Sequence, residues 1–198
     1  MVSNTSQTGD SRRRGMRTIL VVDDSRTNLH VIGARLGAMG YMMVLADSGR
    51  EALDLISGRG FDLVLLDMVM PGMCGLDVLT EIRTAPDTAD LPVIMMTALN
   101  DMRGAVEALA AGADDHLAKP FDFDVLQARI ERTLDRASRI AELKRTVASL
   151  DARIAARAIE LGEARSELAV TRADRARLLG SIDALSARVA TLSGTSAA

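Results

Sequence analysis

The sequence predicts an α/β fold in which a five-stranded, doubly wound parallel sheet is followed by a long α-helical coiled coil. Three observations lead to this prediction. Short apolar runs alternate with amphipathic segments through roughly the first two thirds of the chain. All four aromatic residues and all four prolines lie in that same part. Beyond it, apolar residues recur at the heptad spacing of a coiled coil.

Composition and charge divide the chain at the same places. Residues 17–135 hold 10 Lys and Arg against 19 Asp and Glu, whereas residues 136–198 hold 11 against 7. The residues before them are mostly Ser, Thr, Arg and Gly, which have little to bury. We therefore expect a disordered leader at 1–16, a globular domain at 17–135, a coiled-coil helix at 136–192 and a disordered tail at 193–198.

Five short runs predict the strands of the globular domain. Four of them are apolar on both faces, which is typical of strands that helices cover on both sides. The fifth run is weaker because it contains Asp115 and His116. The predicted strands are 19–22, 42–45, 63–66, 93–96 and 115–118.

Amphipathic segments between these runs predict helices. Ser48 followed by Glu51 has the spacing of a capping box and indicates where the second helix begins. Strands that alternate with helices imply a parallel sheet with right-handed crossovers. The predicted helices are 26–38, 49–58, 75–84, 101–111 and 122–134.

Polar side chains follow four of the five strands. In a parallel α/β sheet, ligands bind at the carboxyl ends of the strands, so these side chains are expected to converge at one edge. They are Asp23 and Asp24 after the first strand, Asp67 after the third, Thr97 after the fourth and Lys119 after the fifth.

Three carboxylates at one edge repel one another and need a cation among them to stay ionised. The ligands are all oxygen atoms, which favours Mg²⁺. Thr97 and Lys119 offer a hydroxyl group and a positive charge that suit a transferring phosphoryl group, and an Asp carboxylate can act as its nucleophile. The sequence has no glycine-rich phosphate loop of the kind that binds a nucleotide.

Together these residues and their surroundings resemble the receiver domain of two-component response regulators, over about residues 17–135. The resemblance rests on Asp23-Asp24, on Asp67 ahead of Pro71-Gly72, on Thr97-Ala98 and on Lys119-Pro120. It implies a flavodoxin-like fold. It also implies that Asp67 accepts a phosphoryl group from a sensor histidine kinase or a phosphotransfer protein.

The resemblance also implies roles for the neighbouring residues. Asp24, Asp67 and the backbone carbonyl of Val69 would bind Mg²⁺, with Asp23 acting mainly through water. Thr97 and Lys119 would bind the phosphoryl oxygens, and Thr97 would take part in the conformational switch.

Two departures from the receiver pattern stand out. His116 lies three residues before Lys119, where receivers usually have Tyr or Phe. We expect it either to replace that aromatic switch residue, with some pH sensitivity, or to be a polar residue of an edge strand. Val69 and Leu99 lie two residues after Asp67 and Thr97, beside the path of the hydrolytic water in receivers. Because aliphatic side chains cannot orient water, we expect slow self-dephosphorylation.

The segment after Leu134 fits a heptad that starts with Ile140 at position a. Seven of the eight a residues and six of the eight d residues are apolar when Ala164 is counted. We expect the fifth helix to run straight into this segment and residues 138–192 to form a parallel homodimer. Arg157 and Arg175 weaken the middle of the seam, and a hairpin near Gly162 is the less favoured alternative.

The expected function is therefore that of a response regulator, not a classical enzyme, which signals through protein contact with an unknown downstream protein. One alternative is a DNA-binding regulator that uses the basic helical tail. Its charge of +4 is spread around the helix, so we do not expect nucleic acid binding. Another is a Mg²⁺-dependent phosphatase with Asp67 as nucleophile, against which Val69 argues, since haloacid-dehalogenase-like phosphatases normally have a second Asp there.

The location of the protein is expected to be cytoplasmic. The single cysteine, Cys74, excludes a disulfide framework within one chain. No apolar run is long enough to span a bilayer, and no apolar stretch of signal-peptide length follows the N-terminal arginines. We expect no membrane partner.

Overall fold

The computed structural model of this chain describes residues 16–99 and 101–195, with side chains described as far as residue 186. The predicted disordered leader lies outside the described residues except for Met16, and so do the last three residues of the predicted tail. The chain divides into two compact units, the first ending at Ala141 and the second beginning at Glu142.

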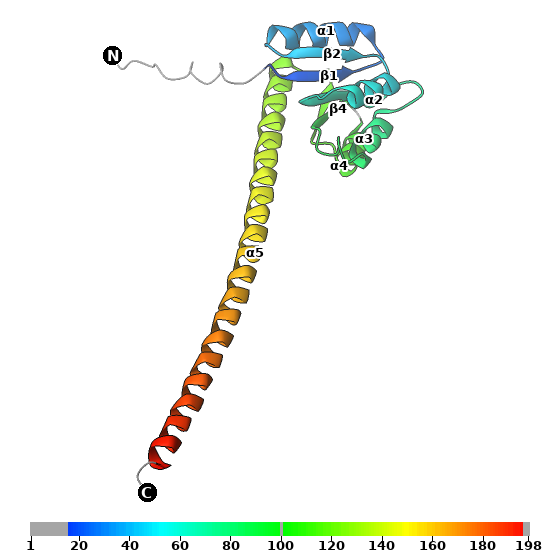
Figure 1. The fold of residues 1–198 in the computed structure, drawn as a ribbon. Coiled ribbons are helices and arrows are strands. Elements are labelled where there is room, and N and C mark those ends of the chain that lie inside the picture. The colour runs from blue at the N-terminus through cyan, green and yellow to red at the C-terminus, as the bar shows by residue number, and fades with distance from the viewer. Residues whose placement is uncertain (1–15, 100, 196–198) are drawn as a thin grey trace, which may run out of the picture. The chain divides into compact units, whose positions relative to one another are not determined.

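Strands and helices alternate in the first unit, which confirms the predicted α/β fold (Figure 1). The strands are parallel and lie in the order β2-β1-β3-β4-β5. The elements are β1 (Thr18–Val22), α1 (Arg26–Ala38), β2 (Met42–Ala46), α2 (Gly49–Gly58), β3 (Leu63–Asp67), α3 (Gly75–Thr84), β4 (Val93–Ala98), α4 (Met102–Ala110), β5 (Asp115–Lys119) and α5 (Phe123–Thr195).

Four of the five strands, β2 to β5, extend one or two residues further toward their carboxyl ends than the apolar runs predict. Asp67, Thr97 and Lys119 therefore lie within β3, β4 and β5, whereas the sequence placed them just after the strands. The backbone ladder does not depend on side-chain polarity, so it continues through these polar residues. Thr97 pairs with Ala118, and Ala98 pairs with Lys119.

Helices cover both faces of the sheet. Residues of α1 and the first turns of α5 pack on one face, where Ile19 and Val21 of β1 are fully buried. Residues of α2, α3 and α4 pack on the other face, where Leu20 and Val22 are fully buried. This two-sided burial is the reason why the strands appear in the sequence as continuous apolar runs.

Side chains cap the first turns of α1 and α2, which follow the carboxyl ends of β1 and β2. The Ser25 hydroxyl accepts a hydrogen bond from the Asn28 N–H in α1. Ser48 accepts one from the Glu51 N–H in α2, as its spacing predicts. The Glu51 carboxylate accepts from the Asp47 N–H, one residue earlier than in a strict capping box.

The last helix, α5, is one helix from Phe123 to Thr195. It includes both the predicted fifth helix and the predicted coiled-coil segment, and it extends three residues beyond the predicted boundary at 192. Within the first unit, Arg129 pairs with Asp115 at 2.6 Å, and Arg17 donates a hydrogen bond to Ser138. No helix in the described part of the chain combines the length and the apolarity that a membrane span needs.

Candidate functional site

The carboxyl edge of the sheet brings three aspartates together. Asp23 follows β1, and Asp67 ends the neighbouring strand β3. Together with Asp24 they offer carboxylate oxygens that all lie within 4.8 Å of one another. Asp23 is 0% exposed and Asp67 is 8% exposed, whereas Asp24 is open to solvent. The cluster is therefore built on buried acids with one exposed member.

Lys119 lies between the two buried acids. Its Nζ is 2.6 Å from Asp23 Oδ2 and 2.9 Å from Asp67 Oδ1. Lys119 ends β5, so its side chain reaches past β4 to β3 and to the end of β1. The ammonium group thus neutralises part of the negative charge of the cluster.

Asp23 is also held by the start of α1. The Ser25 N–H donates to Asp23 Oδ1 at 2.9 Å, and the Asn28 amide donates to both carboxylate oxygens, at 3.0 and 3.2 Å. With Lys119 added, both oxygens of Asp23 have protein partners. That Asp23 acts on a metal indirectly, through water, stays a prediction. Asn28 was missed at the sequence level, although its place in the first turn of α1 beside Asp23 was a possible signal.

The buried environment shifts the pKa values of two residues. Burial, the largest influence, and the charge of Asp23 raise the pKa of the Asp67 carboxyl, whereas Lys119 and the Met68 backbone lower it, and the pKa lies above its ordinary value. Burial lowers the pKa of Lys119, but the hydrogen bonds and charges of Asp23 and Asp67 outweigh this, and the pKa is raised. Lys119 is therefore charged at neutral pH. An additional cation beside Asp67 would stabilise the ionised form of its carboxyl group.

The donor set fits Mg²⁺. All candidate ligand atoms are oxygens, and the described residues of the cluster include no His or Cys. Lys119 contacts one oxygen of Asp67, and Asp67 and the exposed Asp24 each offer a carboxylate oxygen within 4.8 Å of the other. Val69, whose carbonyl was predicted as a further ligand, lies two residues after Asp67, and its side chain is 70% exposed.

The two predicted switch residues occupy different environments. Thr97 is almost fully buried, with 1% exposure, near the end of β4. His116, the second residue of β5, is half-buried, and its neighbour Leu117 packs with α1 and α5. Because side chains alternate along a strand, His116 faces the other side of the sheet. Its Nδ1 is buried and has no hydrogen-bond partner among the described residues.

Gly75 allows α3 to begin directly beside the end of β3. Its N–H donates to the Met68 carbonyl at 2.9 Å. A Cβ atom at this position would overlap the carbonyl oxygen of Asp67 and would lie 2.9 Å from Met95 Cε. The close approach therefore requires glycine, and it holds the backbone of Asp67 in place.

Comparison with known proteins gives a family match to the first unit. The family model of the response regulator receiver domain matches residues 19–131. The chain is 46% identical over 116 residues to the transcriptional regulatory protein ZraR of Escherichia coli. This match covers 59% of this chain and 26% of ZraR. It is 43% identical over 120 residues to the response regulator MprA of Mycolicibacterium vanbaalenii, covering 61% and 51%. The chain thus spans about a quarter to a half of the length of these curated relatives.

Solved structures match the same part of the chain. A response regulator receiver domain protein from Clostridium thermocellum superimposes with a TM-score of 0.60 at 31% identity, covering 63% of this chain and 99% of that chain. The response regulator TrrA of Thermotoga maritima, solved in complex with Mg²⁺ and BeF, has a TM-score of 0.54 at 36% identity and covers 60% and 99%.

Proposed function

Because the chain belongs to the family of response regulator receiver domains, we propose that it accepts a phosphoryl group on Asp67 in a two-component phosphorelay. The donor is the phosphohistidine of a sensor histidine kinase or of a phosphotransfer protein. The observation that carries the proposal is the joint contact of Lys119 with Asp23 and Asp67 beside the exposed Asp24. The same proposal assigns the protein to the cytoplasm, where kinases use ATP.

The transfer needs one nucleophile and little further protein chemistry. A carboxylate oxygen of Asp67 attacks phosphorus, and the new O–P bond forms while the P–N bond of the donor breaks. The electron pair of that bond stays on the imidazole nitrogen of the donor, which then takes up a proton. Mg²⁺ bound by Asp24, Asp67 and the Val69 carbonyl, with Asp23 behind a water molecule, would supply positive charge to the phosphoryl oxygens.

Lys119 and Thr97 connect the transfer to a conformational change. In this structure Lys119 contacts Asp67 Oδ1. A phosphoryl group on Asp67 offers Lys119 a more highly charged partner, and it offers the Thr97 hydroxyl an acceptor. We propose that His116, on the neighbouring strand β5, is the second switch residue, whose side chain moves together with that of Thr97.

The output of the protein is contact with other proteins, not catalysis. Residues 138–192 pair with a second copy of the chain, and an unidentified downstream protein recognises the receiver unit or the helix. The family match ends at residue 131, before the second unit, so it gives no support to DNA binding by that part of α5. Val69, in place of a second aspartate, argues against phosphatase activity.

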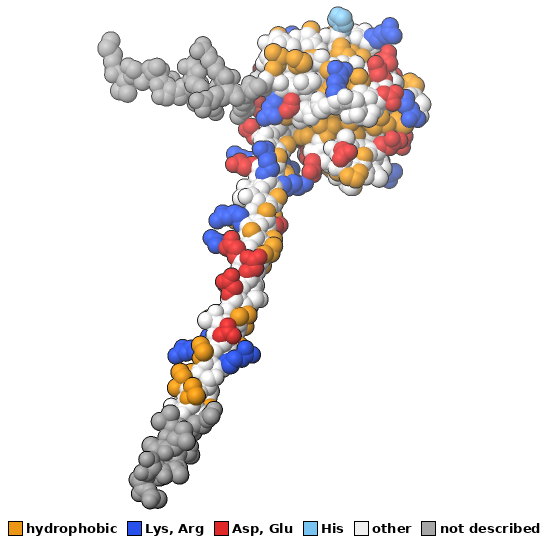
Figure 2. Space-filling view, in the orientation of Figure 1, with side chains coloured by type: hydrophobic (Ala, Val, Ile, Leu, Met, Phe, Trp, Pro, Cys, Tyr) orange, Lys and Arg blue, Asp and Glu red, His pale blue; other side chains and the backbone are white. Residues whose placement is uncertain are grey.

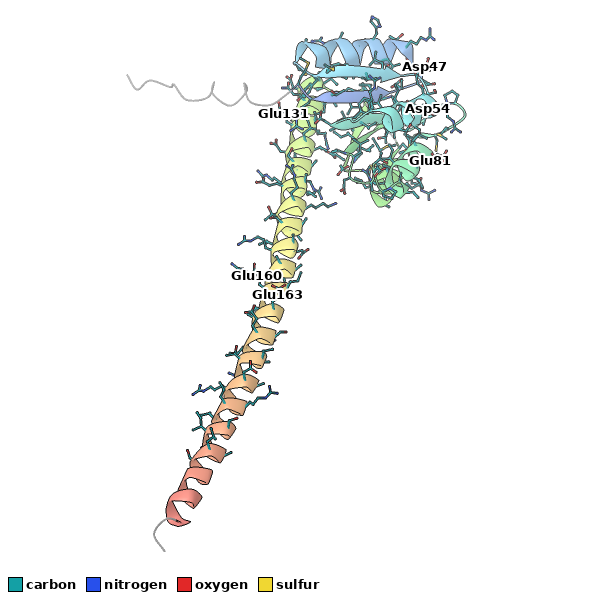
Figure 3. The ribbon with its side chains drawn as sticks, in the orientation of Figure 1. Asp47, Asp54, Glu81, Glu131, Glu160 and Glu163 are labelled. Atoms are coloured by element: carbon teal, nitrogen blue, oxygen red, sulfur yellow. The ribbon has the colours of Figure 1, made fainter. Side chains whose placement is uncertain are left out.

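Mass spectrometry of the intact protein tests phosphoryl transfer. The full chain is incubated with acetyl phosphate and Mg²⁺, and we expect one added phosphoryl group that is lost when EDTA replaces Mg²⁺. Asp67→Asn should remove the modification. The matched control is Asp54→Asn, an exposed aspartate on α2 (Figure 3), which should be modified like the wild type. Modification of Asp67→Asn at the wild-type rate would overturn the assignment.

A further inference from the structure

An exposed apolar stripe runs along α5 beyond the receiver core. Large apolar side chains are between 41% and 66% exposed at ten a and d positions of the heptad, from Ile140 to Leu185. Figure 2 shows hydrophobic side chains recurring along this helix between charged ones. Among the described side chains from Ile140 on, three exposed large apolar residues lie off the stripe: Ile159, Val170 and Leu179. A stripe at this spacing is the seam by which one helix packs against another.

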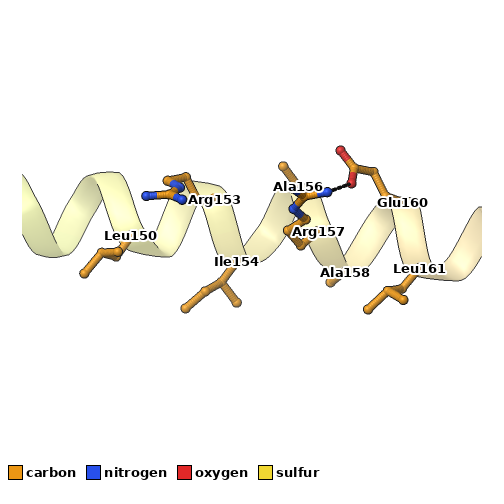
Figure 4. Close-up of a pocket in the computed structure, with 8 residues that line it drawn as sticks. All are labelled: Leu150, Arg153, Ile154, Ala156, Arg157, Ala158, Glu160 and Leu161. Carbon is orange, nitrogen blue, oxygen red and sulfur yellow. Dashed lines mark hydrogen bonds and ion pairs between the residues drawn. The ribbon is translucent and has the colours of Figure 1, made fainter.

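The stripe changes character in its middle. Leu150, Ile154, Ala158 and Leu161 lie along one edge of the helix (Figure 4). Arg157 occupies a d position, but its guanidinium pairs with Glu160 at 2.7 Å. This ion pair holds the charge of Arg157 beside the seam. The middle of the stripe, residues 157–175, keeps Leu161 and Leu168 but has arginine at both of its ends, and we call it the charged segment.

The flanks of this charged segment carry opposite signs. The g positions on one side hold the acids Glu160, Glu167 and Asp174, while the e positions on the other side hold the bases Arg165 and Arg172. All of these residues are exposed on the described helix. In a parallel pair of helices the g flank of one copy faces the e flank of the other. A second copy of this chain is thus a complementary partner.

We infer that α5 forms a parallel, in-register coiled coil with a second copy of the chain, in which the charged segment sets the orientation. This inference rests on the homodimer of the proposed function and specifies its geometry. Glu160 then faces Arg165 of the second copy, and Glu167 faces Arg172.

The charged core residues have acidic neighbours in this arrangement. Arg175 at position a lies next to Asp174 of the second copy, so its charge has an acidic neighbour across the seam. Arg157 has Glu160 as an acidic neighbour on its own helix. Like charges face each other at the receiver-proximal end, where Arg139 faces Lys144, and in the core, where Arg157 and Arg175 each face the same residue of the second copy. The orientation therefore rests on the two attractive flank pairs of the charged segment.

The antiparallel competitor is less favourable. Aligning Leu143 with Ile182 of a reversed copy places Arg157 and Arg175 against leucines of that copy. It also opposes Glu160 to Glu167 twice, although it gains pairs such as Arg153 with Asp174. Exposed pairs contribute only a few tenths of a kcal/mol each. Arg175 packed on leucine loses hydration without the acidic neighbour that Asp174 of a parallel copy supplies.

Cysteine cross-linking of the full chain tests the orientation. In a Cys74→Ser background, Leu143→Cys and Ile182→Cys are made as separate variants, together with Ala152→Cys at the outward f position as control. In the parallel arrangement each of the first two variants forms disulfide-linked dimers by itself, and the control does not. Cross-linking only after Leu143→Cys and Ile182→Cys are mixed would overturn the parallel arrangement.

Charge reversal provides a second, independent readout. Glu160→Lys with Glu167→Lys places like charges across both flank pairs of a parallel dimer, so the dissociation constant should rise by at least about tenfold. Mixing this variant with Arg165→Glu plus Arg172→Glu should restore tight pairing. In the antiparallel arrangement Glu160 faces Glu167, so changing both to lysine replaces one pair of like charges by another. The dissociation constant would then stay unchanged, and that result would contradict the inference.

The outcomes also separate this inference from the proposed function. A chain that cross-links as expected but takes up no phosphoryl group on Asp67 contradicts only the phosphorelay. A chain that remains monomeric by sedimentation and is phosphorylated contradicts only the pairing of α5.

Discussion

The buried carboxylate of Asp23 organises the site at the scale of single residues. It has no solvent exposure, and its oxygens are shared by Lys119, Asn28 and the Ser25 backbone. These contacts hold the Lys119 ammonium next to Asp67. Asp23 is thus suited to position Lys119, while Asp24 and Asp67 remain available to a metal.

The raised pKa of Asp67 predicts how stability depends on pH without metal. A group whose folded pKa is raised adds stability below its ordinary pKa and loses it as pH rises through the raised value. In EDTA, the melting temperature of Asp67→Asn should therefore exceed that of the wild type by a margin that grows from about pH 4 to pH 7. Calorimetric melts of both proteins measure it, and a margin that shrinks over this range would contradict the prediction.

The side chains of Val69 and Leu99 predict the lifetime of the phosphorylated state. They are 70% and 65% exposed, and neither can hydrogen-bond a water molecule. Leu99→Asn should accelerate loss of the phosphoryl group by about an order of magnitude, because the amide can orient attacking water. Intact-mass time courses after removal of the donor measure the rate. The control is Val106→Asn, equally exposed on α4, and an equal acceleration there would refute the explanation.

Gly75 links backbone packing to the site. Gly75→Ala would force Cβ against the Asp67 carbonyl, and we expect a loss of about 1–3 kcal/mol in the free energy of unfolding. Urea unfolding measures this loss. Gly37→Ala is the matched control, because nothing lies within 4 Å of a Cβ there and alanine favours the α1 helix. Equal stabilities of the two variants would contradict the close-approach argument.

At the scale of elements, α5 combines two kinds of sequence in one helix. Its first turns bury Leu126, Ile130 and Leu134 against the sheet, whereas the residues of its second unit are exposed wherever side chains are described. The first part is stabilised by packing within one chain. The second part gains comparable burial only when another helix covers its stripe.

The position of Arg157 predicts that the seam can be strengthened. Arg157→Leu replaces a charge at position d by an apolar side chain and should lower the dissociation constant of the dimer by at least about tenfold, through burial of two leucines per dimer. Analytical ultracentrifugation measures the change. Ala152→Leu at the outward f position serves as control and should leave the constant unchanged. A weaker dimer with Arg157→Leu would place position 157 outside the seam.

At the scale of the whole molecule, the receiver unit and the helical unit have separable tasks. Solved receivers are covered almost completely by the first part of this chain. A chain shortened to residues 16–141 should therefore fold, accept a phosphoryl group with the same Mg²⁺ dependence, and sediment as a monomer. Failure of phosphorylation in this fragment, with its fold intact by circular dichroism, would show that the helical unit contributes to the site.

Much of this architecture was determined by the sequence itself. The apolar runs and the cap at Ser48 depend on neighbouring residues, so the order and the bounds of most helices followed from local spacing. The polar residues at strand ends, from Asp23 to Lys119, followed from the rule that parallel strands share one edge. The heptad likewise predicted a long helix after Leu134.

Only the tertiary structure decided which of these groups touch. The strand order β2-β1-β3-β4-β5 places Asp23 beside Asp67 and lets Lys119 reach both, and local spacing does not contain that order. The overlap that excludes a side chain at Gly75 and the burial that raises the pKa of Asp67 arise from the packing of several segments together. Sequence periodicity reports what each segment buries, whereas contacts and pKa values depend on what the other segments bring to the same place.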